Sequence, residues 1–585
     1  MIDPGRITHK IATSVLPKAL ILGLALTLAP SMVCQGQVLL KYQVEDIASQ
    51  KGELYFPDSL SRANYVQAFL HSLHLEGYPT ANIRTKTFVE DTLHVRLEAG
   101  PPFNWLLLRQ GNLDDGRAKK VGYQESAFRH RPLNFSELKR FFDQILVEAQ
   151  NTGYPFATVR LDSMDVKEGG LEAAINFDPG PYITFDTLEI IGDSKTKPLY
   201  LSRLLRVPPA APFSQTAIDR ALKALQKVPY LQLVDQPALT FQNQTARVIL
   251  PINDRRINTL DGIIGVLPNE AEDNKLLVTG QFNLSLHNVA GRGRNYHLQW
   301  QRLSRYSQNL AVSAKEPLLF GSLLDLSMSF DLLKEDTTFL NRDFKVGFTY
   351  PVHPNLSVGF FSRRQAGDLL EAPVESLAVG IADIADFRYN NYGLNMEWST
   401  LEQSFGARRG VLTTFELGIG NKKILENTAL PPEFYEGLDK NAAQYYVTLS
   451  AEKHLLLSPS FGVWMRLRGA EMGSRHLFLN DLFRLGGLNS IRGFNENFFF
   501  AKRYVYANFE PRYYFDRNSF FLLFFDWGRI KDNKEAMDQP LAVGGGISLE
   551  TDQGVFSFIY ALGKSKTQTM GFNFSKVHFG YTGRF

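Results

Sequence analysis

The spacing of apolar residues changes once along the chain, near residue 257. Before that point, apolar side chains recur three and four residues apart, as on one face of a helix, in a stretch that begins near Asp58 and in another around 138–146. After it, helical spacing disappears, and apolar and polar residues alternate between clusters of Gly, Pro, Asn and Asp. The pattern predicts an α+β region followed by an all-β region.

The α+β region repeats itself. Asp58 is a good N-cap for the first helix, which ends in the Gly-Tyr-Pro turn Gly77–Ala81. About 76 residues later, the second helix ends in a similar turn, Gly153–Ala157. Two strand-like runs follow each turn, namely Asn82–Phe88 with Thr92–Leu97 and then Thr158–Met164 with Leu171–Phe177. The same order at equivalent places predicts two related units.

A third, more divergent copy precedes the all-β region. Val228–Tyr230 replaces the Gly-Tyr-Pro turn in this copy. The predicted elements are a strand at Ile183–Ile191, helices near Leu199–Leu205 and Gln215–Lys227, and a strand at Ala246–Ile252. The expected units span residues 37–100, 101–180 and 181–256. The alternative is a set of generic α+β modules that share only Pro-marked turns.

Residues 257–585 have the pattern of a transmembrane barrel. Within 504–515, Phe509 and Tyr513 lie on one face of a strand, whereas Asn508, Glu510 and Arg512 lie on the other. The first face suits lipid and the second suits a polar lumen. Roughly 330 residues, at about 20 per strand and connection, predict sixteen antiparallel strands, and an even number is expected for a single-chain bacterial barrel.

The last run of the chain also alternates and ends in an aromatic residue. Its apolar face carries Val577, Phe579, Tyr581 and Phe585. A terminal aromatic after an alternating strand is typical of outer-membrane barrels, where it serves as an assembly signal. A soluble β-sandwich would explain the alternation, but not the aromatic outer faces together with the terminal Phe.

The N-terminus resembles a secretory leader. Cationic residues come first, an apolar stretch runs from Ala19 to Val33, and small residues precede a cleavage point after Gly36. We therefore expect a signal peptide over residues 1–36. A single anchoring helix is the alternative, but Pro30 interrupts the stretch, which is shorter than the ~20 residues of a span. Cys34, the one cysteine, is an alternative lipidation site.

Composition agrees with a barrel behind soluble units. At 585 residues the chain is too long for one core. The formal net charge of +3 gives no nucleic-acid footprint. Mean hydropathy is slightly negative although 12% of residues are aromatic, because a barrel hides its lipid-facing side chains at every second position.

One long connection carries a distinctive motif. The run Phe483–Phe494 contains two glycines and then Ile-Arg-Gly-Phe, and a later strand contains Phe-Phe-Asp-Trp-Gly at Phe524–Gly528. These motifs, with Asn288–Gly293 and Glu316–Gly321, resemble the BamA/TamA outer-membrane assembly superfamily, whose members carry POTRA domains before a surface-antigen-type barrel. Three units and sixteen strands are closest in layout to TamA. The resemblance covers nearly the whole chain after the leader.

The resemblance implies that the connection is an extracellular loop folded into the barrel, where its arginine pairs with an acid on the wall. A guanidinium inside a barrel needs such a carboxylate. The other interpretation is that Arg492 and Asp526 are two of many lumen charges. The candidate site residues are Gly486, Gly487, Ile491, Arg492, Gly493 and Phe494 in the loop, Glu510, Phe524, Asp526 and Gly528 on the wall, and Val577, Phe579, Tyr581 and Phe585 at the seam between the first and last strands.

The resemblance also implies a function. The implied function is that of a Gram-negative outer-membrane assembly factor. Its periplasmic POTRA domains would receive unfolded barrel or surface proteins, which would be inserted or translocated at the seam. The implied partners are such unfolded clients, outer-membrane lipid and lipopolysaccharide, and a periplasmic or inner-membrane accessory protein, with no nucleic acid. A two-partner-secretion transporter and a passive porin are the alternatives. The eleven His residues are scattered, so no catalytic set, metal site or cofactor is expected.

Overall fold

The computed structural model describes residues 38–47, 50–167, 170–269, 275–302, 306–371, 384–402, 406–428, 430–516, 518–551 and 553–585. The predicted leader and Cys34 lie outside these ranges. The chain forms two compact units: the first ends at Gln150 and also contains Phe156–Gly180, and the second contains Asn151–Pro155 and Pro181–Phe585. No helix within the described ranges has the length and apolar character needed to cross a bilayer.

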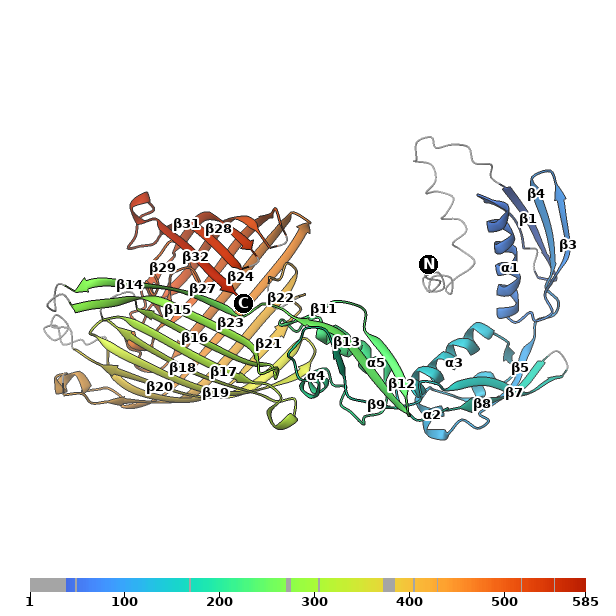
Figure 1. Cartoon of the computed structure of the whole chain (residues 1–585), viewed down its shortest axis with the longest axis horizontal. Coiled ribbons are helices and arrows are strands. Elements are labelled where there is room, and N and C mark those ends of the chain that lie inside the picture. The colour runs from blue at the N-terminus through green and yellow to red at the C-terminus, as the bar shows by residue number, and fades with distance from the viewer. Residues whose placement is uncertain are drawn as a thin grey trace. The chain divides into compact units, whose positions relative to one another are not determined.

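The first sheet of the first unit has the order β2-β1-β4-β3 and packs against α1 (Figure 1). As predicted, α1 starts after Asp58, whose carboxylate accepts a hydrogen bond from the Ser61 backbone N at 2.7 Å. Both predicted strands are present, whereas β1 and β2 were not predicted. The bounds are β1 (Val38–Glu45), β2 (Lys51–Phe56), α1 (Ser59–Leu75), β3 (Asn82–Val89) and β4 (Thr92–Glu98).

The second sheet repeats this arrangement in the order β6-β5-β8-β7. The apolar face of α3 is buried at Leu138, Phe141 and Ile145, as its spacing predicts. The predicted strands correspond to β7 and β8, while β5 and β6 were not predicted. The bounds are β5 (Asn104–Arg109), α2 (Asp115–Lys120), β6 (Arg131–Pro132), α3 (Phe135–Gln150), β7 (Thr158–Lys167) and β8 (Gly170–Asp178).

The second unit begins with a smaller module built around the central strand β13. The predicted strand Ile183–Ile191 is wrong as one element, because its two ends pair separately with β13 at Thr184–Phe185 and Glu189–Ile191. Both helices are confirmed. The bounds are β9 (Thr184–Phe185), β10 (Glu189–Ile191), α4 (Pro198–Leu204), α5 (Gln215–Leu225), β11 (Leu231–Leu233), β12 (Ala238–Gln242) and β13 (Thr245–Asp254).

The rest of the second unit is a closed antiparallel barrel of sixteen described strands, which confirms the predicted fold class (Figure 1). The short β29 (Met537–Asp538) extends β30 along β28. The strands are β14 (Thr259–Asn269), β15 (Lys275–Val289), β16 (Arg294–Arg302), β17 (Gln308–Glu316), β18 (Asp325–Glu335), β19 (Phe339–His353), β20 (Leu356–Leu369), β21 (Asp386–Ser399), β22 (Gly410–Leu425), β23 (Asn441–Ser458), β24 (Phe461–Gly473), β27 (Arg503–Tyr514), β28 (Phe520–Lys531), β30 (Leu541–Thr551), β31 (Gly554–Lys564) and β32 (Lys576–Arg584).

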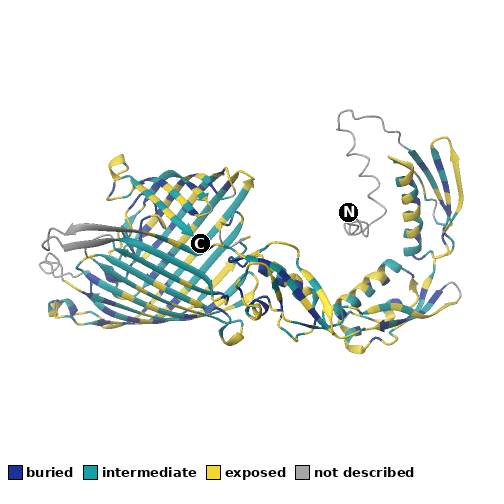
Figure 2. Cartoon of the chain, viewed as in Figure 1, coloured by how far each residue is buried: buried dark blue, intermediate teal, exposed yellow. Residues whose placement is uncertain are grey.

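Burial alternates along the barrel strands as the sequence predicts (Figure 2). On β28, Phe521, Leu523 and Phe525 are exposed on the outer face, whereas Phe524 and Asp526 are buried on the inner face. This alternation presents an aromatic surface to lipid. It also fixes which side chains can build a site in the lumen.

Candidate functional site

The connection between β24 and β27, residues 474–502, folds against the inner wall of the barrel, and we call it the lumen loop. It contains the short hairpin β25 (Phe483–Leu485) and β26 (Phe499–Ala501). Ile491 and Phe494 are fully buried and belong to one apolar cluster with Tyr506 of the wall. The six loop residues singled out in the sequence are all buried. Apolar packing and ion pairing therefore both hold the loop in place.

Arg492 is bound to two acidic residues of the wall. Its Nε and Nη2 donate to the two oxygens of Asp526 at 2.9 and 2.7 Å, and its Nη1 donates to Glu510 Oε2 at 2.5 Å. The Phe524 ring lies beneath the guanidinium, with its centroid 3.7 Å from Cζ. Glu510 also accepts from Arg512 at 2.7 Å. Two arginines and two acids thus form a buried cluster without net charge.

Three residues of the wall motif, Phe524, Asp526 and Gly528, lie on one face of β28, and each of them contacts the lumen loop. Phe524 stacks under the guanidinium, and Asp526 also accepts a hydrogen bond from the Arg492 backbone N at 3.0 Å. Gly528 leaves room for the loop, since a Cβ there would lie 2.8 Å from the Cδ1 of Ile491. Gly493 has a φ of +85°, and a Cβ on it would lie 2.7 Å from the Gly563 backbone N. Because the three residues of the wall motif are spaced two positions apart, all of them face the lumen and bind the loop.

A second ion pair holds the first half of the lumen loop, and the sequence did not predict it. Lys422 of β22 pairs with Asp481 of the loop, and both side chains are almost fully buried. The Lys422 ammonium lies between the rings of Phe387 and Phe478, 4.8 Å from each centroid. Strand alternation places Lys422 in the lumen, but no motif in the sequence joins it to a residue 59 positions away.

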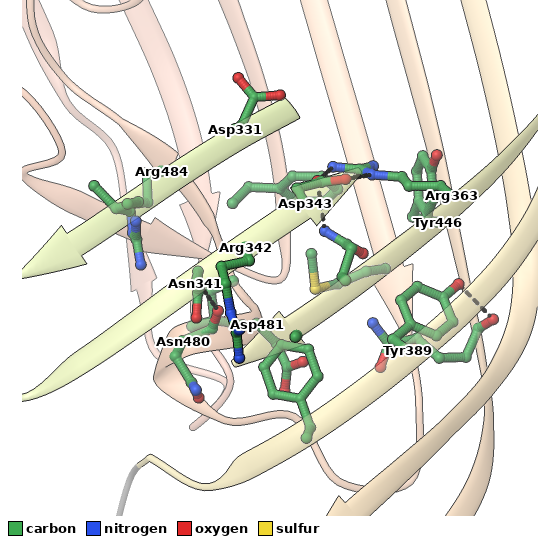
Figure 3. Close-up of a pocket in the computed structure, with 18 residues that line it drawn as sticks. Asp331, Asn341, Arg342, Asp343, Arg363, Tyr389, Tyr446, Asn480, Asp481 and Arg484 are labelled. Carbon is green, nitrogen blue, oxygen red and sulfur yellow. Dashed lines mark hydrogen bonds and ion pairs between the residues drawn. The ribbon is translucent and has the colours of Figure 1, made fainter. Parts of the chain in front are cut away.

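Amide side chains reinforce this second attachment. Asn341 of the wall donates from Nδ2 to the Asn480 carbonyl at 2.7 Å, and Asn480 donates to the Ala385 carbonyl at 3.0 Å. Figure 3 shows Asn480, Asp481 and Arg484 from the loop facing wall residues across a cavity of about 220 Å³. The loop is therefore attached to two separate parts of the wall, once through Asp481 and once through Arg492.

Ion pairs line the inner face of the wall from β19 to β22. Arg363 donates from Nε to both Asp343 oxygens at 2.9 and 2.8 Å (Figure 3). Lys345 binds Glu416 at 2.6 Å, with the Tyr446 hydroxyl donating to the same carboxylate at 2.7 Å. This part of the lumen is thus rich in paired charges. Among the described residues, no three His, Cys, Asp or Glu side chains gather in a way that could hold a metal ion.

The barrel closes between β14 and β32 through a very short ladder. Only two register pairs are formed, Thr259 with Arg584 and Leu260 with Gly583. By comparison, eight pairs join β31 to β32 and eleven join β14 to β15. A cavity of about 1000 Å³ lies on the inner side of this seam, between the two terminal strands and the tip of the lumen loop.

The four C-terminal residues singled out in the sequence lie along β32 and just beyond it. Val577, Phe579, Tyr581 and Phe585 are all exposed, as their shared face predicts. None of the four forms a register pair with β14, because that pairing is made by Gly583 and Arg584, the last two residues of β32. Only the backbone N of Phe585 reaches across, donating to the Asn258 carbonyl at 3.1 Å.

The turn Asn288–Gly293, between β15 and β16, binds the module that precedes the barrel. Asn288 donates from Nδ2 to Thr196 Oγ1 at 2.8 Å, and the Lys197 backbone N donates to the Gly291 carbonyl at 2.8 Å. The second family-like run, Glu316–Gly321, forms the next turn on that side of the barrel. Gly293 of the first run lies against Tyr200 of α4, and Gly321 of the second run lies against Arg203 of α4, so both runs attach α4 to the barrel rim.

A closed barrel with a lumen loop, aromatic outer faces and α/β modules before it defines a class of outer-membrane transport and assembly barrels. The Omp85 superfamily domain matches residues 288–584, just over half of the chain. The chain belongs to the Omp85 superfamily. It is thus a barrel of a bacterial outer membrane with a general role in polypeptide insertion or translocation, and the resemblance drawn from the motifs is confirmed. Members of this superfamily are transporters and assembly factors and not enzymes.

Two solved structures of CdiB share this fold. CdiB from Escherichia coli is 14% identical over 90% of this chain and 97% of its own, with a TM-score of 0.51. CdiB from Acinetobacter baumannii is 12% identical over 80% and 86%, with a TM-score of 0.50. BamA from Haemophilus ducreyi lacking POTRA domains 1–3 is 14% identical over 83% and 99%, with a TM-score of 0.43. No curated protein matches the chain by sequence.

Proposed function

We propose that the chain is an outer-membrane assembly factor of the BamA/TamA kind, which receives unfolded barrel or surface proteins and inserts or translocates them at its seam. The observation that carries this proposal is the two-pair ladder between β14 and β32. Backbone groups in lipid need hydrogen-bond partners, so an edge left unpaired by such a short ladder favours an incoming strand. A passive porin has no use for such a seam.

The N-terminal α/β modules support delivery of clients. We interpret them as POTRA-like domains in the periplasm, where β3 and β7 each lie at the edge of a sheet. An edge strand can add a strand from an extended chain through backbone hydrogen bonds, which impose little sequence preference. An accessory protein would bind to these modules, whereas lipid and lipopolysaccharide surround the barrel.

We assign the lumen loop a bracing role. Arg492 and its partners Asp526 and Glu510 hold the loop tip beside the seam cavity, and Lys422 with Asp481 holds its base. A fixed loop keeps the neighbouring wall strands in shape while the seam opens. The glycines and Phe494 of the motif allow the loop to pack closely enough for that task.

A disulfide across the seam tests the proposal. Leu260→Cys with Gly583→Cys joins two residues that face each other in β14 and β32. The matched control is Gly554→Cys with Gly583→Cys, which joins β31 to β32 within a stable hairpin. We expect the oxidised seam variant to accumulate unfolded outer-membrane proteins and the control to work normally. Full activity with an oxidised seam would contradict insertion at this place.

Depletion separates the candidate functions. Loss of many barrel proteins from the outer membrane is the outcome expected for an assembly factor. Loss of one secreted protein, with normal barrels, would identify a two-partner-secretion transporter instead. Loss of small-solute uptake alone would identify a porin.

A further inference from the structure

The cavity beside the seam has a wall of carboxamide side chains. Five of them point inward from three neighbouring strands, and all five are half-buried. They are Gln281 and Asn283 of β15, Gln299 and Gln301 of β16, and Asn309 of β17. We call this set the amide wall. Figure 1 shows its strands next to β14 in the barrel.

Strand register makes the amide wall continuous. Gln281 lies opposite Gln301, Asn283 lies opposite Gln299, and Gln301 lies opposite Asn309. Directly opposed residues on neighbouring strands have Cβ atoms about 5 Å apart, so each amide is beside the next. The five side chains therefore form one patch that crosses three strands.

The hydrogen-bonding capacity of this patch is largely unused inside the protein. Asn283 donates from Nδ2 to Asp261 Oδ1 at 2.6 Å. Within the described ranges, no side-chain hydrogen bond is formed by Gln281, Gln299, Gln301 or Asn309. Each carboxamide offers two N–H donors and one carbonyl acceptor, the same groups that a peptide bond presents. The patch can thus pair with a backbone in either strand direction.

The amide wall differs in charge from the other side of the lumen. Between β19 and β22, the inner face carries the ion pairs of Arg363 with Asp343 and Lys345 with Glu416. The five amides carry no charge, so they neither attract nor repel charged clients at long range. Asp261 and Glu496 also line the cavity, but the amide wall itself is neutral. Its donors and acceptors fit a chain whose composition varies but whose backbone does not.

We propose that the amide wall is a binding site for the backbone of an extended polypeptide, which it holds in the lumen beside the seam. This inference rests on the proposed function, since the polypeptide is the client being inserted. The β14 edge offers backbone groups in the plane of the barrel, and the amide wall offers side-chain groups behind it. Together they keep the polar groups of a client paired before its own strands have formed.

Photo-cross-linking tests the site in the full-length protein reconstituted in nanodiscs. A benzophenone residue replaces Gln301 on the amide wall, Tyr581 on β32 next to the seam pairs, or Asn395, an inward amide of β21 that serves as the control. The probe is a small outer-membrane barrel protein unfolded in urea and then diluted. We expect cross-links from positions 301 and 581 and roughly tenfold fewer from 395.

Side-chain variants test the chemistry. Replacing Gln281, Gln299, Gln301 and Asn309 by Ser keeps the cavity polar but removes the amide N–H and C=O groups and leaves a shorter hydroxyl, which extends less far into the cavity. Because a few ordinary hydrogen bonds are lost, we expect capture of the probe to fall about tenfold. The exchanges Gln→Asn and Asn→Gln at the same positions keep the amides and should retain capture. Unheated gel mobility verifies that every variant barrel is folded.

The outcomes separate the two proposals. Cross-links from 581 without any from 301 would overturn the amide wall and leave insertion at the seam standing. Full capture by the Ser variant would also overturn it. No cross-links from either position would contradict the proposed function and this site with it.

Discussion

At the scale of single residues, the buried charges that attach the lumen loop to the wall each have an opposite partner. Arg492 is shared between Asp526 and Glu510, and Lys422 is closed in with Asp481. A buried ion pair contributes little net stability, but removal of one partner leaves the other charge buried without compensation, which is strongly destabilising. At both sites, a substitution of one partner should therefore lower the free energy of unfolding more than a substitution of both partners.

Arg492→Met should lower the free energy of unfolding by about 3–5 kcal/mol, because Asp526 stays buried without its counter-charge. The double change Arg492→Met with Asp526→Leu should cost less than the single change. Guanidinium unfolding of the purified barrel measures both. The control is Arg503→Met, which breaks a surface pair with Glu471 and should cost less than about 1 kcal/mol. Additive losses in the double variant would contradict a shared ion pair.

Lys422→Met should release the base of the lumen loop by leaving Asp481 uncompensated. Trypsin should then cleave at Arg484, which the folded loop protects, while the pair Arg492–Asp526 stays intact. Lys440→Met removes a surface pair with Glu426 and is the matched control. Unchanged protection of Arg484 in the Lys422 variant would show that apolar packing alone holds the base.

At the scale of elements, the helix α4 is attached to the barrel rim by several short contacts. Within its own module, Tyr200 of α4 bonds to Tyr230 at 2.6 Å between hydroxyl oxygens, and burial raises the pKa of Tyr200 to about 12. The pair thus stays neutral at physiological pH. The Tyr200 hydroxyl also lies where a Cβ on Gly293 would be, so only glycine fits there.

Gly293→Ala should loosen α4 from the rim, because the new Cβ overlaps the Tyr200 hydroxyl at a φ of +71°. Hydrogen exchange of the α4 amides should become faster. Gly437→Ala provides the control, since its φ of +77° gives the same backbone strain in open space. Equal exchange in the two variants would mean that the contact with Tyr200 does not hold the helix.

At the scale of the whole molecule, the number of register pairs between neighbouring strands varies around the barrel. The seam has two register pairs, whereas fourteen join β22 to β23. Local opening should start where the fewest bonds must break. The outer edges of β14 and β32 are therefore the parts of the barrel that can separate without loss of the remaining sheet.

Hydrogen exchange around the barrel checks this order. In nanodiscs, amides of β14 and β32 near the seam should exchange far faster than those of β22 and β23. The oxidised Leu260→Cys, Gly583→Cys variant should slow the seam amides and leave β22 unchanged. Uniform exchange around the barrel would contradict a weak seam.

The sequence predicted much of this molecule because strand alternation is a local property. Successive side chains point to opposite faces, so the inward positions of Asn508, Glu510 and Asp526 followed from the strand pattern alone. The strands β5 and β6 were missed because short or irregular strands leave little alternation to detect. The split of Ile183–Ile191 was missed because it depends on how two short segments pair with β13.

The order of α/β units and barrel and the face of each regular strand could be predicted from the amino-acid sequence, because they depend on spacing along the chain. The pairing of Arg492 with Asp526 could be predicted from the family resemblance of the two motifs. Only the tertiary structure decided that Lys422 meets Asp481, that the seam has two register pairs, and that five amides share one wall. These features depend on barrel closure and on the register between strands. Both are set by contacts between segments far apart in the sequence, which no local pattern contains.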